Sequence, residues 1–291
     1  MRKVSVIIPC YNQGEYVAEA INSVFNQTYK NIEIVVFNDA SKDNSRKIIK
    51  SFGKKVVFID EKENHGVIYA RNKAIAKSTG EYILPLDADD VIEPTYIEKA
   101  VKVLDEKPDI GIVYCKARMF GAENKEWNLP PFLLDKFLYS NCIFCSALFR
   151  KSDFVAVGGY NENMKEGWED WDFWLSLIEK GVGVYRIEDI LFNYRRHFVQ
   201  SRTDRADSNK PLLYKKLFMN HIPLYLNHND FFYKAFNTPV VKKEVKVSVN
   251  INHIKMLEKI EKKIYKLRKK IKQSILLWAA LLVLFLLYVC I

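Results

Sequence analysis

The chain has 291 residues, of which 49% are hydrophobic and 27% charged, a composition typical of a globular protein with one large domain and an appendage. Its net charge of +10 would suit a nucleic-acid-binding protein. However, nine Lys or Arg and two Glu between Lys255 and Lys272 supply +7 of that charge and leave only +3 elsewhere. The basic charge is therefore local, and no nucleic-acid partner is expected. The five cysteines are too few and too scattered for a disulfide framework.

Strands and helices alternate in the first hundred residues. Continuous apolar runs predict strands at 4–9, 32–37, 56–59 and 82–86. Helical spacing predicts helices at 14–27, from 41–43 onward and at 67–77. Because such alternation builds a sheet whose crossover helices cover both faces, we expect an α/β fold with a mostly parallel sheet flanked by helices.

A second block follows, with predicted strands at 110–115, 142–149 and 182–187 and a predicted helix at 168–180. The aromatic-rich stretch from 212 to 249 gives no clear pattern. The expected division of the chain is 1–205, 206–250, 251–274 and 275–291.

The C-terminus differs in kind from the rest of the chain. Apolar residues spaced by three, four or seven predict a basic amphipathic helix at 251–274. Residues 275–291 are seventeen uncharged and mostly apolar residues, which is at the short end of what spans a bilayer. A buried terminal helix and a solvated coiled coil are the alternatives. We expect a single C-terminal membrane anchor, with the large domain on the cytoplasmic side because excess Lys and Arg mark that side.

The string Asp87-Ala88-Asp89-Asp90 closes the apolar run at 82–86. Three carboxylates this close repel one another unless a positive group sits among them. A divalent cation shared with a phosphate group would satisfy them. The alternative is an Asp-rich turn that caps the helix beginning near Pro94.

Several further motifs stand at predicted strand ends or helix starts. In chain order they are Pro9-Cys10-Tyr11-Asn12, Asn38-Asp39-Ala40-Ser41, Asn64-His65-Gly66, Ala70-Arg71-Asn72, Gly158-Gly159-Tyr160-Asn161-Glu162, Trp168-Glu169-Asp170-Trp171 and Tyr194-Arg195-Arg196-His197. Together with the acidic string, this ordered set resembles the family 2 glycosyltransferases, which have the GT-A fold. The resemblance covers roughly residues 3 to 201, and its specificity lies in the order of the motifs.

The resemblance implies a role for each motif. Asp170 would be the general base, with Glu169 beside it, while Asp87 and Asp89 would hold Mn²⁺ or Mg²⁺. An aromatic ring such as that of Tyr11 can stack on a base, and an arginine such as Arg71 is suited to phosphate. The residues that would bind the nucleotide-sugar donor are Pro9, Tyr11, Asn12, Asp39, Arg71, Asp87, Ala88, Arg196 and His197.

The implied function is transfer of a hexosyl or N-acetylhexosaminyl group, with inversion, from a nucleotide-diphosphate sugar to a hydroxyl acceptor. A UDP-linked donor is expected. The acceptor would be a glycan or a lipid-linked molecule of cell-surface glycan, polysaccharide or glycolipid synthesis, and a homo-oligomer is compatible with the sequence. A non-catalytic nucleotide-sugar-binding membrane protein stays open. A nucleotidyltransferase is disfavoured, because no Gly-rich basic phosphate loop follows the first strand.

Overall fold

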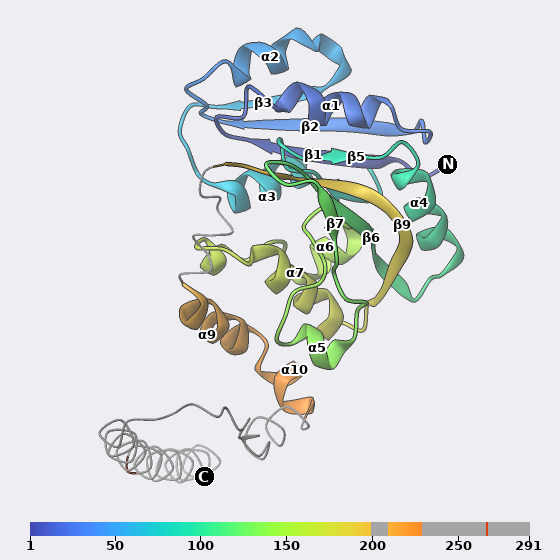
Figure 1. Cartoon of the computed structure of the whole chain (residues 1–291), viewed down its shortest axis with the longest axis vertical. Helices are drawn as coiled ribbons and strands as arrows, with labels where there is room; N and C mark the ends of the chain where they lie inside the picture. Colours follow the sequence, from blue (N-terminus) through green and yellow to red (C-terminus); the bar gives the residue numbers. More distant parts are fainter. Residues whose placement is uncertain (199–208, 229–265, 267–291) are drawn as a thin grey trace, which may run out of the picture. The chain divides into compact units, whose positions relative to one another are not determined.

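The computed structural model describes residues 1–198, 209–228 and 266 (Figure 1). The chain divides into a compact unit from Met1 to Asn237 and a second unit from Thr238 to Ile291. The predicted membrane segment at 275–291, and the amphipathic helix at 251–274 apart from Lys266, lie outside the described residues. Within the described part, no helix has the length and apolar character needed to span a membrane.

The described strands all belong to one nine-stranded sheet. They are β1 (Val4–Cys10), β2 (Ile32–Asp39), β3 (Val57–Glu61), β4 (Tyr82–Pro85), β5 (Val91–Ile92), β6 (Ile110–Gly121), β7 (Lys125–Trp127), β8 (Leu148–Arg150) and β9 (Gly183–Arg196). The α-helices are α1 (Val17–Phe25), α2 (Ser45–Ser51), α3 (Val67–Lys77), α4 (Tyr96–Glu106), α5 (Leu134–Phe137), α6 (Lys151–Val157), α7 (Glu169–Glu179), α9 (Lys210–Asn220) and α10 (Ile222–Asn227), with short 3₁₀ turns at Gly53–Lys55 and Glu162–Met164.

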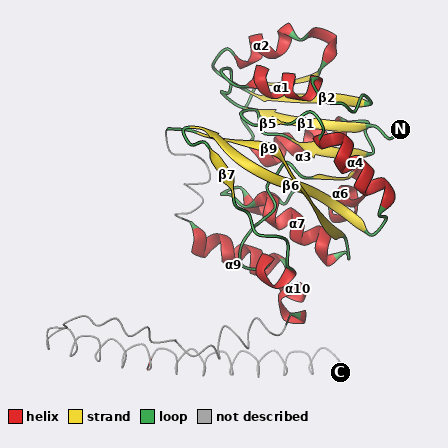
Figure 2. Ribbon diagram, turned by 45° about the vertical axis from the view of Figure 1, so that its right-hand side comes forward, coloured by secondary structure: helices red, strands yellow, loops and turns green. Residues whose placement is uncertain are grey.

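The first half of the sheet is parallel, as the alternation predicts. β1 pairs in parallel with both β2 and β4, and β2 pairs in parallel with β3. All seven residues of β1 are buried, because α1 and α2 lie on one side of these strands and α3 lies on the other (Figures 1 and 2). Connections through crossover helices bring the carboxyl ends of β1, β2 and β4 to one edge, where ligands bind in sheets of this type.

The prediction of a mostly parallel sheet is wrong beyond β4. The strand order is β3-β2-β1-β4-β8-β6-β9-β5, with β7 paired to β6. β8 is antiparallel to both β4 and β6, β7 is antiparallel to β6, and β5 is antiparallel to β9, whereas β6 and β9 are parallel. The sheet is therefore mixed, because strict strand–helix alternation ends at β4, which is followed directly by β5.

The predicted strand at 142–149 is also wrong, since only its end belongs to β8. The preceding residues are buried without a strand ladder, and side chains satisfy part of their backbone instead. The hydroxyl of Tyr96 donates to the carbonyl of Ser146 at 2.7 Å, and the N–H of Ile143 donates to Oδ1 of Asn141 at 2.9 Å. An apolar run alone does not distinguish such a buried irregular segment from a strand.

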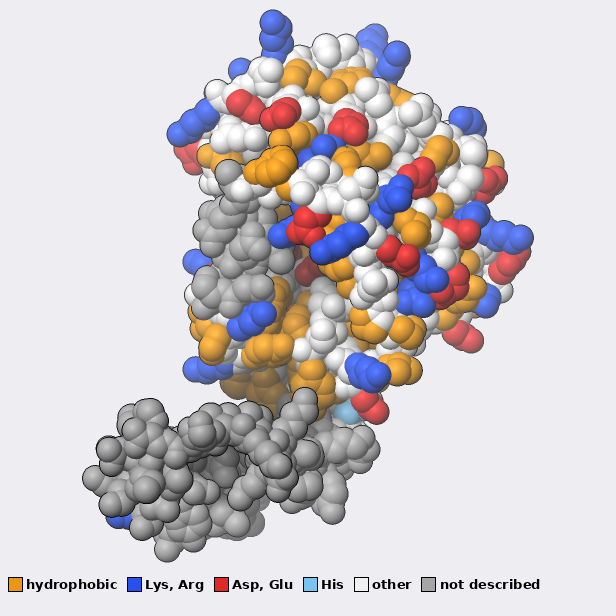
Figure 3. Space-filling view, viewed as in Figure 1, with side chains coloured by type: hydrophobic (Ala, Val, Ile, Leu, Met, Phe, Trp, Pro, Cys, Tyr) orange, Lys and Arg blue, Asp and Glu red, His pale blue; other side chains and the backbone are white. Residues whose placement is uncertain are grey.

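The surface of the described part carries both signs of charge. On the face in Figure 3, Lys and Arg side chains are interspersed with Asp and Glu over the sheet-bearing part of the molecule. This mixed face agrees with the small net charge of the sequence outside the basic segment.

Candidate functional site

The candidate site lies where β1, β2, β4 and the start of α7 meet, and the backbone there is strained. Among the described residues, the three non-glycine residues with positive φ are Asn12 (53°), Ala40 (58°) and Trp168 (57°). Each one belongs to, or adjoins, a motif that the sequence singled out. Strain of this kind persists only where surrounding contacts enforce it, and it concentrates at functional sites.

Asn12 and Tyr11 follow the buried Pro9 at the end of β1. The N–H of Asn12 donates to Oγ of Ser41 at 3.0 Å, and its side-chain Oδ1 accepts from the N–H of Lys42 at 2.7 Å. These bonds fasten the end of β1 to the loop after β2. The ring of Tyr11 is left 44% exposed, so one face of a planar ligand can reach it.

Asp39, at the end of β2, fastens the start of α3. Its two carboxylate oxygens accept from the N–H groups of His65 at 2.9 Å and Gly66 at 2.8 Å. Gly66 has φ of 87°, a conformation that suits glycine, and it immediately precedes α3. A carboxylate has about four lone-pair positions, so Asp39 keeps acceptor capacity for a ligand.

Arg71 on α3 joins the acidic loop after β4 to the start of α7. Its NH2 donates to Oδ1 of Asp87 at 2.6 Å and its NH1 donates to Oε1 of Glu169 at 2.8 Å. The Arg71 side chain is 2% exposed. Burial alone would lower the pKa of Arg71, but the carboxylates of Asp87 and Glu169 more than offset it and raise the pKa well above its usual value. This geometry favours a bridging role over the direct phosphate contact expected from sequence.

A second layer of contacts holds Arg71 in place. The side-chain amide of Asn72 accepts from the N–H of Tyr160 and donates to its carbonyl, both at 2.9 Å. The guanidinium of Arg71 lies 5.6 Å from the centre of the Tyr160 ring, within range of a cation–π contact. The loop at Gly158-Gly159-Tyr160 is thus hydrogen-bonded to α3 at Asn72, the residue next to Arg71.

The second acidic residue of the loop, Asp89, faces the end of β9. Its Oδ2 lies 2.8 Å from Nε2 of His197. Burial and the neighbouring Asp87 raise the pKa of Asp89, while His197 opposes that rise. Ala88, between the two aspartates, is buried.

Arg195 contacts the acidic loop. Nε of Arg195 donates to the carbonyl of Asp89 at 2.8 Å, and its N–H donates to Oδ1 of the buried Asp90, also at 2.8 Å. The guanidinium lies between the rings of Tyr16 and Phe120, at 4.6 and 4.2 Å. Arg196 instead lies beside Glu123, with Nε 3.4 Å from Oε1.

The donor atoms of Asp89 and His197 fit a cation that also binds phosphate. Within the described ranges, no three His, Cys, Asp or Glu residues form a ready metal cluster. A carboxylate and an imidazole within 2.8 Å nevertheless supply two ligands, and Mg²⁺ or Mn²⁺ at a phosphate site commonly takes only one or two from the protein. The residues present are therefore compatible with a shared metal site.

Helix α7 begins with carboxylates that have different partners. Glu169 is 5% exposed and bonded to Arg71. Asp170 is partly exposed: its Oδ1 accepts from the N–H of Trp171 at 2.7 Å, and Nδ2 of Asn141 approaches its Oδ2 at 3.5 Å. Glu169 is thus engaged by a cation, whereas Asp170 faces the loop at Asn141.

The thiol of Cys145 lies beside Asp87. Its Sγ lies 3.5 Å from Oδ2 of Asp87. Burial raises the pKa of the Cys145 thiol, and the charges of Asp87 and then Asp170 raise it further, against the lowering effect of Arg71. The thiol is therefore a neutral donor in the middle of the charged groups.

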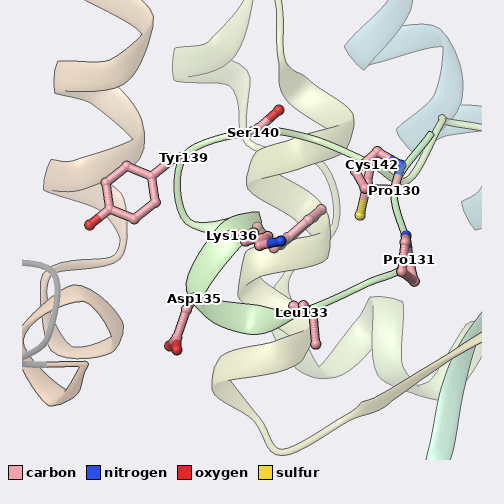
Figure 4. Close-up of a pocket in the computed structure, with 9 residues that line it drawn as sticks. Pro130, Pro131, Leu133, Asp135, Lys136, Tyr139, Ser140 and Cys142 are labelled. Carbon is pink, nitrogen blue, oxygen red and sulfur yellow. The ribbon is translucent and has the colours of Figure 1, made fainter. Parts of the chain in front are cut away.

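A hollow of about 320 Å³ lies in the segment before Cys142 (Figure 4). Its lining includes Pro130, Leu133 and Tyr139, and none of the site residues predicted from sequence contributes to it. The segment adjoins α7, since Nε1 of Trp171 donates to the carbonyl of Phe137 at 2.9 Å. The hollow therefore belongs to the segment that packs against α7 and does not contain the candidate site residues.

Replacing Arg71 with methionine, which keeps the proximal methylene groups but removes the guanidinium, should lower the free energy of unfolding by about 3–5 kcal/mol, because it removes the cation that faces the buried carboxylate of Glu169. The matched control is Arg46→Met, since Nε of Arg46 pairs with Asp60 at 2.7 Å but its side chain is 58% exposed. That variant should lose less than about 1 kcal/mol. Urea unfolding checks both, and equal losses would contradict the bridging role.

The sequence profile of glycosyl transferase family 2 matches residues 5–158, more than half of the chain. A profile described as the N-terminal domain of galactosyltransferase matches residues 135–200. An uncharacterized glycosyltransferase of Rickettsia typhi is 33% identical over 215 residues, which cover 68% of this chain and 65% of that protein. An uncharacterized glycosyltransferase of Haemophilus influenzae is 28% identical over 256 residues, covering 81% and 78%.

The chain thus spans about two thirds of the length of the Rickettsia relative. Among solved structures, TarS residues 1–349 of S. aureus in complex with UDP-GlcNAc superposes with a TM-score of 0.61 at 20% identity, covering 69% of this chain and 60% of that chain. The mannosyltransferase PcManGT of Pyrobaculum calidifontis, in complex with GDP-Man and Mn²⁺, superposes with a TM-score of 0.55 at 19% identity, covering 81% and 76%. From the family match and the fold, the chain belongs to glycosyl transferase family 2 and has the GT-A fold.

Proposed function

We propose that this glycosyltransferase moves a hexosyl or N-acetylhexosaminyl group, with inversion, from a nucleotide-diphosphate sugar to a hydroxyl group of a glycan or lipid-linked acceptor. The observation that carries the proposal is the Arg71 bridge. It holds the acidic loop through Asp87 and the start of α7 through Glu169. A donor-binding edge and a candidate base, Asp170, are thereby kept beside each other.

The donor side of the proposal rests on the edge formed by β1, β2 and β4. Tyr11 offers a ring to the base, while Asn12 and Asp39 shape the loops around it. A UDP-linked donor is the first choice to test, because the TarS neighbour is in complex with UDP-GlcNAc; the mannosyltransferase neighbour with GDP-Man is the reason to test GDP sugars as well.

Asp89 and His197 would hold a divalent cation together with the donor diphosphate, with Asp87 beside them. A bound cation neutralises the charge that develops on the leaving diphosphate. His197 also contacts Tyr16, with ring centres 5.2 Å apart, so the end of β9 is ordered beside the loop.

Asp170 is the proposed general base. It accepts the proton of the acceptor hydroxyl while that oxygen bonds to the anomeric carbon, and the bond from that carbon to the diphosphate oxygen breaks. Glu169 is a positioning residue in this scheme, because Arg71 neutralises it. A single carboxylate acting as base favours a single displacement, unlike the opposed carboxylate pair of glycosidases.

Turnover of a nucleotide sugar tests the function directly. The full chain is incubated with UDP-GlcNAc, UDP-glucose, UDP-galactose or GDP-mannose and Mn²⁺ or Mg²⁺, and release of the nucleoside diphosphate is followed. We expect release from one donor and its loss in EDTA. Binding without release would support a non-catalytic nucleotide-sugar protein, whereas pyrophosphate release from a nucleoside triphosphate and a sugar phosphate would support a nucleotidyltransferase.

Asp170→Asn should lower turnover by about 10²-fold or more, because the amide keeps the size of the side chain but is not a base. The dissociation constant for the donor should stay close to that of the wild type. Asp189→Asn is a matched control, since Asp189 is exposed and lies outside the candidate site. Its Oδ2 pairs with Nζ of Lys99 at a distance of 2.9 Å. A collapse of donor affinity with turnover preserved would show that Asp170 is a donor ligand.

A further inference from the structure

The third acidic residue of α7, Asp172, has a role that the proposed reaction does not use. Successive helical residues are rotated by about 100°, so Asp170 and Asp172 point to faces of α7 about 200° apart. Asp172 is 1% exposed, and a carboxylate buried to this extent requires partners. Those partners come from the end of α9 and the residue that follows it.

His221 connects two carboxylates of α7. Its Nε2 lies 3.2 Å from Oδ1 of Asp172, and its Nδ1 lies 3.2 Å from Oε2 of Glu179. Glu179 ends α7 and follows Asp172 by about two helical turns, so both carboxylates lie on the same face of the helix and converge on the imidazole. Asn220 adds a bond from Nδ2 to the same oxygen of Asp172 at 2.6 Å. His221 itself is 2% exposed.

The rest of α9 holds the loop before α7. Lys216 bonds to Glu166 and to the carbonyl of Asn163, and the amide of Asn163 donates to that of Asn220 at 2.8 Å. The ring of Tyr214 contacts that of Trp168 with centres 4.8 Å apart. Trp168 is the strained residue that immediately precedes Glu169 and Asp170. Helix α9 and the residue after it therefore contact both the N-terminus of α7, through Trp168, and the face of α7 that carries Asp172.

The charged groups around His221 favour its protonated form. Burial lowers the pKa of His221, but Asp172 and then Glu179 raise it, with a net rise above the usual value. The other titratable groups nearby are Tyr225, whose own pKa is raised by burial, and the Lys216–Glu166 pair. Nε2 is within hydrogen-bond distance of Asp172, whereas Nδ1 has no hydrogen-bond partner among the described residues and faces Glu179 at ion-pair distance. A protonated ring therefore attracts both carboxylates by charge, and a neutral ring does not. The bridge is therefore complete only when His221 is charged.

We propose that His221 is a positioning residue that holds α7, and with it Asp170, by bridging Asp172 and Glu179 on the face of the helix opposite the base. This inference rests on the proposed role of Asp170. Small displacements of a reacting group reduce rates strongly. Weakening the contacts of His221 with Asp172 and Glu179 should therefore displace Asp170 and lower turnover, although no group that touches the donor is removed. Because the folded protein raises the pKa of His221, the stabilisation is full below about 6.5 and is lost as pH rises through the folded-state pKa.

The test uses His221→Gln in the full chain, with His228→Gln as the matched control. His228 lies in the same segment, but its Nδ1 pairs with the carbonyl of Leu224 at 2.8 Å. Release of UDP from UDP-GlcNAc, or of GDP from GDP-mannose if only that donor is turned over, is measured between pH 5.5 and 9.5 as kcat and donor KM. Melting curves and far-UV circular dichroism show whether each variant is folded.

For His221→Gln we expect kcat to fall about tenfold near neutral pH, with donor KM within about twofold of wild type. The wild-type decline of kcat at alkaline pH should disappear in this variant, and His228→Gln should match the wild type. Glu179→Gln is a milder second variant that serves if His221→Gln does not fold. This substitution removes one of the two negative charges that raise the pKa of His221, so the decline of kcat at alkaline pH should begin at a lower pH.

Three results would overturn the inference. One is a wild-type kcat and pH profile in folded His221→Gln, and another is a loss confined to donor KM. The third is an unmoved alkaline decline in Glu179→Gln. In each case Asp170→Asn still decides the proposed function separately: if that variant is inactive while His221→Gln is normal, only the positioning role fails. If the wild type releases no nucleotide from any donor tested, both proposals fail.

Discussion

The ion pairs of Arg71 are the constraint on which the rest of the site depends. A buried guanidinium requires carboxylate partners, and those of Arg71 stand 82 residues apart in the chain: Asp87 follows β4 and Glu169 begins α7. Such a cluster contributes little net stability compared with an apolar core, but removing Arg71 takes away the cation that faces the buried carboxylate of Glu169. The two ion pairs therefore tie α3 to both the end of β4 and the start of α7.

This constraint separates the roles of two adjacent carboxylates. Glu169 is buried and bonded to a cation, and Asp170 is partly exposed beside Asn141. The same helix is restrained on its opposite face by Asp172. Three acidic residues within four positions thus have three environments, although a helix N-terminus would stabilise all of them by its dipole alone.

The sequence predicted the parts of the fold and site that depend on local pattern. The parallel strands β1 to β4 follow from apolar runs separated by helical periods, and the residues brought together at their ends, such as Asp87 and Asp89, stand in recognisable motifs. The mixed second half did not follow, because the buried stretch before β8 has the same apolar character as a strand. Pairings such as Arg71 with Glu169 and His221 with Asp172 join residues 98 and 49 positions apart, and no local pattern encodes them.

The central claim is that the Arg71 bridge leaves a single carboxylate, Asp170, to act on the acceptor. One carboxylate acting as a base requires direct displacement and therefore inversion at the anomeric carbon. Proton NMR of the product formed from an α-linked donor with an axial H2, such as UDP-GlcNAc, UDP-glucose or UDP-galactose, measures this outcome through the coupling constant of the anomeric proton. The account predicts a β-linked product as the first species formed, and an α-linked product would contradict it.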